Sequence, residues 1–168
     1  GLLNTNSRFL YRSLADFSER LLATTGDGGY DSVLLVNSGT EAVDLALRIA
    51  RLATGRSQVI AHREGYHGWS MAADAITTSA YDNPSALHTR PSWVSLAEAP
   101  NPYRGRHRGP DAGPSYLRDA GRLVDGLVAG GTPPAAVVME SILGNAGGVV
   151  PPPGYFAGVI DLVHRAGG

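Results

Sequence analysis

The amino-acid sequence predicts an α/β fold with a mainly parallel sheet flanked by helices. Two observations lead to this class. Short apolar runs bounded by turn residues alternate along the chain with longer segments whose apolar residues recur at helical spacing. The apolar runs are continuous, which is typical of strands buried on both faces. Strands that alternate with helices indicate crossover connections and therefore a parallel sheet.

The first part of the chain is expected to contain two helices and two strands. Ser13-Leu-Ala-Asp16 resembles a capping box and indicates where the first helix begins. In the second helix, Asp44 and Arg48 are expected to form a favourable i,i+4 pair on the polar face. In chain order we predict a helix over 13–25, a doubly buried strand over 32–36, a helix over 40–52 and a strand over 59–61.

The second part continues the same alternation. Gly and Pro residues cluster between its elements, and such clusters are typical of loops rather than of helices or strands. We predict a weaker strand over 92–96, a surface loop over 100–114, a helix over 116–129, a strand over 135–139, a Gly/Pro-rich loop over 144–154 and a helix over 155–166. The domain organisation expected is a helical segment over 1–30 and an α/β core over 31–168.

Composition excludes several classes of protein. The 168 residues include no cysteine, so disulfides, cysteine zinc sites and thiol nucleophiles are excluded, and no metal site is expected. The net charge of −1 gives no general attraction for nucleic acid or membranes, and the basic cluster 104–108 is interpreted as a solvated loop. No apolar stretch is long enough for a transmembrane helix, and no signal peptide is recognised, which favours a cytoplasmic protein. All 14 basic residues are arginine, so no lysine chemistry can come from this chain.

The turn Asn37-Ser-Gly-Thr40 joins a predicted strand to a predicted helix. Parallel sheets bind ligands beyond the carboxyl ends of their strands, and the first amides of a helix attract anions. Gly39 permits close approach of the backbone, and the Ser38 and Thr40 hydroxyls can add hydrogen bonds, so the turn is suited to a phosphate group. The alternative is an ordinary helix N-cap, for which Ser and Thr are also common.

Several stretches together resemble class III pyridoxal-phosphate (PLP) aminotransferases. "NSGTEAVDLALRIAR" is similar to their phosphate-binding segment, "GYHG" at 65–68 follows at the family's distance, and "AAVVMESILGNAGGVVPPPGYF" at 135–156 resembles a further block. "LNTNSRFLYRSLADFSERL" is similar to the branch of ethanolamine-phosphate phospho-lyase and alanine–glyoxylate aminotransferase-like proteins. The resemblance implies the large domain of PLP fold type I, represented incompletely.

The resemblance also implies a cofactor site. The turn 38–40 would hold the PLP phosphate, and Tyr66 would lie against the pyridine ring, although a tyrosine there can equally belong to the core. His67 would form part of the same wall or lie at the surface. Glu140 would order the site or cap a strand end. The cofactor-binding residues implied in this way are Ser38, Gly39, Thr40, Tyr66, His67 and Glu140.

The substrate side is implied more weakly. Asn6 and Phe9, in the opening segment, and Asn145, in the 144–148 loop, would line the substrate site. Ser141 and Leu143 depart from the proline and glutamine that are usual in the family. Asn145 stands where some relatives carry a glutamate that pairs with a gating arginine, which argues against dual-carboxylate substrates.

Three functions stay open at this point. The family resemblance implies an aminotransferase that moves an amino group from an amino acid or amine to a 2-oxo acid, working as a homodimer. It equally allows a phospho-lyase acting on a phosphorylated amino alcohol. The third reading is a non-catalytic fragment, because the family's pyridine-binding aspartate strand and Schiff-base lysine are expected downstream of Gly168. By its own residues the chain is expected to be inactive, with no catalytic residue assigned.

Overall fold

The structure is a computed structural model that describes residues 11–26 and 28–168. The chain divides into two compact units, residues 1–36 and 37–168. In the first unit, α1 (Arg12–Ala23) carries exposed apolar side chains. The second unit contains α2 (Gly39–Thr54), β1 (Gln58–His62), α3 (Met71–Ile76), α4 (Ala86–Thr89), β2 (Val94–Ala97), α5 (Ala112–Ala129), β3 (Pro134–Val138) and α6 (Tyr155–Arg165).

The three strands form a parallel sheet in the order β2-β1-β3. Val59 pairs with Val94 on one side, and Ile60 pairs with Val137 on the other. The central strand β1 is buried along its whole length. A strand covered on both faces needs apolar residues in succession, and this is why 59–61 is a continuous apolar run. The predicted fold class is confirmed.

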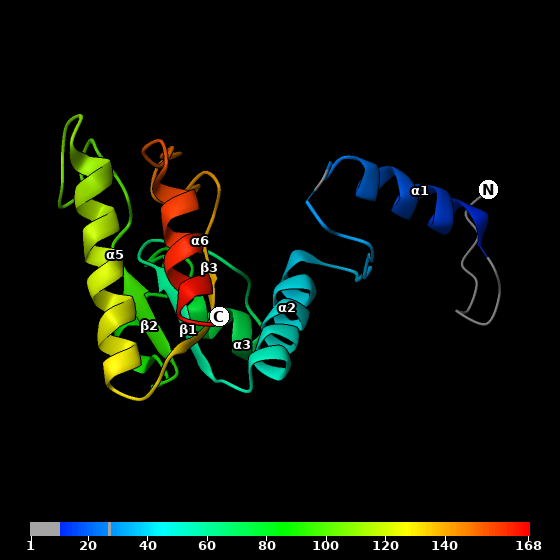
Figure 1. Cartoon of the computed structure of the whole chain (residues 1–168), viewed down its shortest axis with the longest axis horizontal. Coiled ribbons are helices and arrows are strands. Elements are labelled where there is room, and N and C mark those ends of the chain that lie inside the picture. The colour runs from blue at the N-terminus through cyan, green and yellow to red at the C-terminus, as the bar shows by residue number, and fades with distance from the viewer. Residues whose placement is uncertain (1–10, 27) are drawn as a thin grey trace. The chain divides into compact units, whose positions relative to one another are not determined.

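Helices cover both faces of this sheet (Figure 1). Val59 and Ala61 pack with Leu47 of α2 and Ile76 of α3 on one face. Ile60, between them in sequence, points to the other face, where α5 and α6 pack against it and against each other. Because side chains alternate along a strand, one short run of apolar residues supplies both halves of the core.

A buried polar pair lies within this core. His62 ends β1, and its Nε2 lies 2.8 Å from the hydroxyl oxygen of Tyr155, the first residue of α6. Both residues are only 2% exposed. Burial disfavours the charged forms, so it lowers the pKa of His62 to about 4 and raises the pKa of Tyr155. The histidine is therefore neutral in the folded protein at neutral pH.

Two local expectations are wrong in the first unit. Residues 32–36 form no strand, and three of their apolar side chains, from Leu34 to Val36, are exposed. A strand requires a partner for its backbone groups, and no ladder forms here among the described residues, whatever the composition favours. The capping box is also absent, since α1 begins at Arg12 after Tyr11, which makes no side-chain cap.

Further differences lie in the second unit. Asp44 accepts a hydrogen bond from Ser70 Oγ at 2.6 Å, instead of forming the predicted ion pair with Arg48. The short helices α3 and α4 were not predicted, because four to six residues carry too little periodic signal. Helix α5 begins within the predicted loop 100–114, and Pro114 is tolerated because it lies in the first helical turn. In the part of the chain that the structure describes, no helix is long and apolar enough to cross a membrane.

Candidate functional site

The turn before α2 is a well-formed helix start. Ser38 is the N-cap, and its Oγ accepts the amide of Glu41 at 3.2 Å, while the Glu41 carboxylate accepts the amide of Asn37 at 2.6 Å. The ordinary N-cap interpretation is thus correct as far as it goes. The amides of Gly39 and Thr40, the first two residues after this N-cap, precede the first intrahelical hydrogen bond. They therefore face outward at the positive end of the helix dipole. Ser38 and Gly39 are exposed and open to a ligand.

The loop Gly65–Gly68 follows β1 at the carboxyl edge of the sheet. Three consecutive amides in it donate to three side chains. Gly65 N–H donates to Thr78 Oγ1 at 3.0 Å, and His67 N–H donates to Thr77 Oγ1 at 3.0 Å. Between them, Tyr66 N–H donates to Glu140 Oε1 at 2.8 Å. The backbone of this loop is therefore fixed at each peptide.

The loop lies directly against the start of α2. Gly68 has φ of +129°, and a Cβ added there would lie 2.7 Å from Thr40 Oγ1 and 2.9 Å from Ala73 Cβ. Only glycine fits both the backbone angle and this close approach. The Ser70 hydroxyl, which caps α3, donates to Asp44 on α2 and holds the same two segments together.

A pocket of about 360 Å³ opens between the loop and α2. Tyr66 on its wall is 38% exposed, and so it is not a core tyrosine. His67 is 8% exposed, its Nε2 has no hydrogen-bond partner among the described residues, and burial lowers its pKa, an effect that the nearby Glu140 carboxylate partly opposes. A neutral histidine thus forms part of the pocket wall. The residues that line the pocket are Gly39, Thr40, Val43, Tyr66, His67 and Gly68.

Glu140 joins two loops at the end of β3. One carboxylate oxygen accepts the amide of Tyr66, and the other accepts the amide of Gly144, each at 2.8 Å. Hydrogen bonds from backbone N–H groups to a carboxylate are stronger than those between neutral groups. The side chain therefore ties the Gly65–Gly68 loop to the turn that follows β3, whatever it contacts in addition.

Asn145 lies in that turn and is not one of the residues that line the pocket. Its amide donates to the Asp82 carboxylate and to Ser79 Oγ. It thereby connects the 143–149 turn, which is closed by the backbone pairing of Leu143 with Val149, to the segment after α3. Asn6 and Phe9 lie outside the described residues, so their predicted place near the substrate stays a prediction.

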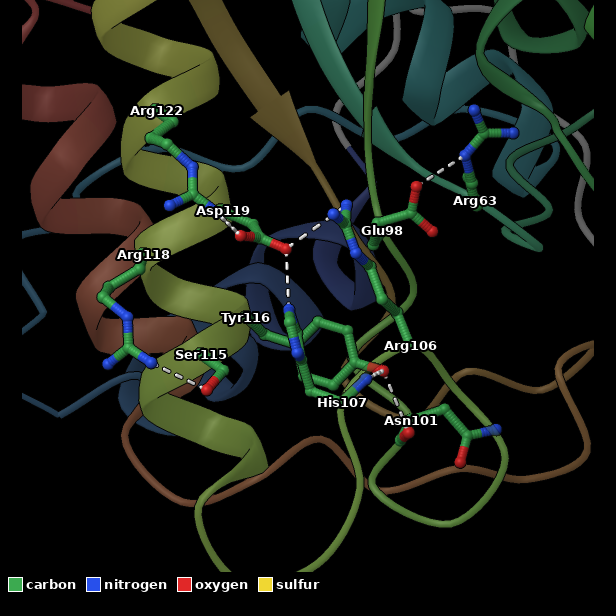
Figure 2. Close-up of polar contacts among 10 residues, drawn as sticks. All are labelled: Arg63, Glu98, Asn101, Arg106, His107, Ser115, Tyr116, Arg118, Asp119 and Arg122. Carbon is green, nitrogen blue, oxygen red and sulfur yellow. Dashed lines mark hydrogen bonds and ion pairs between the residues drawn. The ribbon is translucent and has the colours of Figure 1, made fainter.

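The basic cluster 104–108 is exposed at its arginines, as expected of a solvated loop, yet it is held in place (Figure 2). His107 Nε2 lies 2.7 Å from Asp119 Oδ2, and Arg106 and Arg122 also pair with this carboxylate. His107 and these arginines keep the pKa of Asp119 below its usual value. The backbone amide of His107 donates to the Tyr116 hydroxyl, which in turn donates to the Asn101 carbonyl.

A sequence model described as aminotransferase class-III matches residues 2–167. The chain belongs to the class-III aminotransferase family. The resemblance seen in the motifs is thereby confirmed, together with the branch that they indicated.

Two relatives illustrate that branch. This family member is 33% identical to ethanolamine-phosphate phospho-lyase homolog 1 of Caenorhabditis elegans, over 97% of this chain and 37% of the relative. It is 34% identical to the alanine–glyoxylate aminotransferase 2-like protein of Drosophila melanogaster, over 99% of this chain and 34% of the relative. The chain thus spans about a third of the length of these relatives.

Solved structures agree with this assignment. A taurine:2-oxoglutarate aminotransferase from Bifidobacterium kashiwanohense, in complex with PLP and glutamate, superposes with a TM-score of 0.81 and 27% identity, over 96% of this chain and 36% of the other. A phospholyase from Arthrobacter in complex with phosphoethanolamine gives 0.80 and 29% identity, over 99% and 38%. The class-III chain has the fold of both proteins over nearly all its length.

Sequence reasoning missed the residues that hold the site together. Thr77 and Thr78, after α3, fix the Gly65–Gly68 loop, and Ser70 with Asp44 ties that loop region to α2. The run Thr77-Thr-Ser79 after an apolar helix was the one available signal. It does not say which distant backbone the hydroxyls contact, and that information comes only from the fold.

Proposed function

We propose that this chain is part of the PLP-binding large domain of a class-III aminotransferase, with the pocket at the start of α2 as its cofactor site. The observation that carries the proposal is the pocket itself. It brings the outward-facing amides of Gly39 and Thr40 together with the exposed ring of Tyr66 and the buried imidazole of His67. These groups lie at the carboxyl edge of a parallel sheet, where ligands bind in α/β folds.

The residues present fit a phosphorylated pyridine. The helix start supplies amides and hydroxyls at Ser38 and Thr40 for a phosphate dianion. Tyr66 offers an aromatic face for the ring. Gly68 lets the loop approach α2 so closely that a side chain there would fill the cradle. When bound, the cofactor would supply an electron sink for chemistry at the substrate's α-carbon.

The roles proposed for this chain are binding and positioning. Ser38, Gly39 and Thr40 would hold the phosphate, and the neutral His67 would wall the site beside Tyr66 without adding a positive charge. The chain has no lysine, so the amine that relatives attach to the cofactor does not come from it, and residues 1–168 alone are expected to be inactive.

The transferase activity, with an amino acid or amine as donor and a 2-oxo acid as acceptor, is proposed for the full-length gene product that contains this chain. A homodimer and a cytoplasmic location complete the proposal. Asn145, held against Ser79 and Asp82, is proposed to lie beside the substrate.

Phospho-lyase activity is the second candidate. The similarity to the phospholyase that was solved with phosphoethanolamine favours it. Purified full-length protein is given alanine with a 2-oxo acid, or phosphoethanolamine alone. Pyruvate from alanine supports amino transfer, and release of inorganic phosphate from phosphoethanolamine supports elimination. If neither product forms, both activities are refuted in favour of a non-catalytic role.

The cofactor site is tested by introducing a negative charge in a way that leaves the helix cap intact. Asp and Asn both cap helices as well as Ser does, so Ser38→Asp and Ser38→Asn should keep the stability of the full-length protein. Asp places a negative charge where the phosphate is proposed to bind, and so PLP affinity should fall about 100-fold or more, as a close repulsion of about 3 kcal/mol implies. Ser38→Asn is the matched control. Equal PLP affinity in both variants contradicts the assigned site.

A further inference from the structure

The Gly65–Gly68 loop is held by hydroxyl groups from outside the pocket. Thr78 Oγ1 accepts the Gly65 amide at 3.0 Å and donates to the His62 carbonyl at 2.7 Å, so it bridges the loop to the end of β1. The Gly65 carbonyl accepts the backbone amides of Thr78 and Ser79, at 2.7 and 3.0 Å. Both polar groups of the Gly65 residue are therefore bound to one short segment.

Thr77 makes a second bridge at the far end of the loop. Its Oγ1 accepts the His67 amide at 3.0 Å and lies within donating distance of the Gly68 carbonyl at 3.0 Å and the Ala73 carbonyl at 2.9 Å. Its residue exposure is 1%, and that of Thr78 is 5%. Neither hydroxyl is placed to touch a ligand, because neither residue lines the pocket.

These bonds fix the stretch of backbone that carries the Tyr66 side chain. Thr78 and Thr77 hold the amides on either side of the Tyr66 residue, and Glu140 holds the Tyr66 amide itself. A peptide fixed on both sides leaves the Cα–Cβ direction of the residue between them with little freedom. Since a buried amide that loses its acceptor is costly, removing a hydroxyl should destabilise this conformation of the loop.

We propose that Thr77 and Thr78 are positioning residues of the cofactor site, which aim Tyr66 and His67 into the pocket beside Thr40 without touching the ligand. The inference rests on the proposed PLP site. It extends that site to a segment 37 residues beyond Thr40 in the sequence. It assigns to two buried hydroxyls the role of holding Tyr66 and His67 in the geometry that binds the ring. Small errors in the placement of binding groups are costly, because affinity and reactivity both depend on pre-organised geometry.

The test uses the full-length gene product with Thr77→Val and Thr78→Val, which keep side-chain volume and remove the hydroxyl. Thr77→Ser and Thr78→Ser restore the hydroxyl, and Thr132→Val is a matched control at an exposed position. PLP affinity and the circular dichroism induced in bound PLP are measured well below the melting temperature. We expect the valine variants to bind PLP about 10-fold more weakly with an altered signal, and the serine and Thr132 variants to match the wild type, as loss of a buried hydrogen bond implies.

A double-mutant cycle separates positioning from a general effect on folding. In a Tyr66→Ala background, Thr78→Val should change PLP affinity less than about 2-fold, because Thr78 holds the Gly65 amide rather than the His67 amide and the ring that it positions is gone, while its effect on the melting temperature persists. If a valine variant does not fold, the alanine variant of the same residue repeats the measurement. An undiminished effect in the Tyr66→Ala background overturns the inference, as does wild-type PLP binding by both valine variants. A folded wild-type protein that does not bind PLP refutes the proposed function itself, and the inference with it.

Discussion

Replacing Gly68 by alanine tests the closest contact in the site. The new Cβ would lie 2.7 Å from Thr40 Oγ1 and 2.9 Å from Ala73 Cβ, distances that real Cβ atoms do not show. The backbone angle of +129° adds strain for any residue with a side chain. Strain of this kind costs about 1–3 kcal/mol, and forcing a methyl group into a packed contact costs a similar amount, so the free energy of unfolding should fall by about 2–6 kcal/mol.

A matched Gly→Ala change elsewhere in the chain should have the opposite sign. Gly126 lies within α5, and a Cβ there would meet nothing within 4 Å. Alanine favours a helix interior over glycine, so Gly126→Ala should stabilise the protein by about 0.5–1 kcal/mol. Both substitutions add one methyl group, so any general effect of that addition cancels when the two variants are compared.

Urea unfolding followed by far-ultraviolet circular dichroism measures both changes. The midpoint should move down for Gly68→Ala and up for Gly126→Ala, with an unchanged slope. PLP affinity, measured where both variants are folded, should fall for Gly68→Ala alone, since the loop must move away from Thr40. If Gly68→Ala unfolds within about 0.5 kcal/mol of the wild type, the loop does not approach α2 as described, and the cradle argument is wrong.

Two further predictions concern buried and paired charges. Because the pKa of His62 is lowered from 6.5 to about 4, the unfolded chain binds a proton between these pH values that the folded protein does not, and so stability should fall as the pH decreases through this window. The free energy of unfolding should fall by about 3 kcal/mol in all. This fall should be absent in His62→Asn and retained in His88→Asn, an exposed control. Equal pH profiles for the wild type and His62→Asn would contradict the lowered pKa of His62. At neutral pH, Asp119→Asn should destabilise the protein by about 1–3 kcal/mol and speed proteolysis of the 101–111 loop, because Arg106, His107 and Arg122 lose the carboxylate that they share. Asp125→Asn, on the exposed side of α5, should leave urea unfolding and cleavage unchanged, and the same behaviour in Asp119→Asn would disprove the anchoring role.

The sequence by itself determined the alternation of strands and helices. The strand cores at 59–61 and 135–138 and the helices α2 and α6 lie within a few residues of their predicted positions, because hydrophobic periodicity and glycine stops are local signals. The motif resemblance also led to the correct family, since several ordered motifs are more specific than any one of them.

Tertiary structure decided what local pattern cannot encode. Residues 32–36 have the composition of a buried strand yet form none, because a strand exists only with a partner. The hydroxyls of Thr77 and Thr78 reach a loop about ten residues away, and the Glu140 carboxylate reaches Tyr66 from the segment that follows the neighbouring strand β3. Sequence periodicity reports which face of an element is apolar, whereas contacts between loops depend on how the elements are placed in space, and the candidate site is built from such contacts.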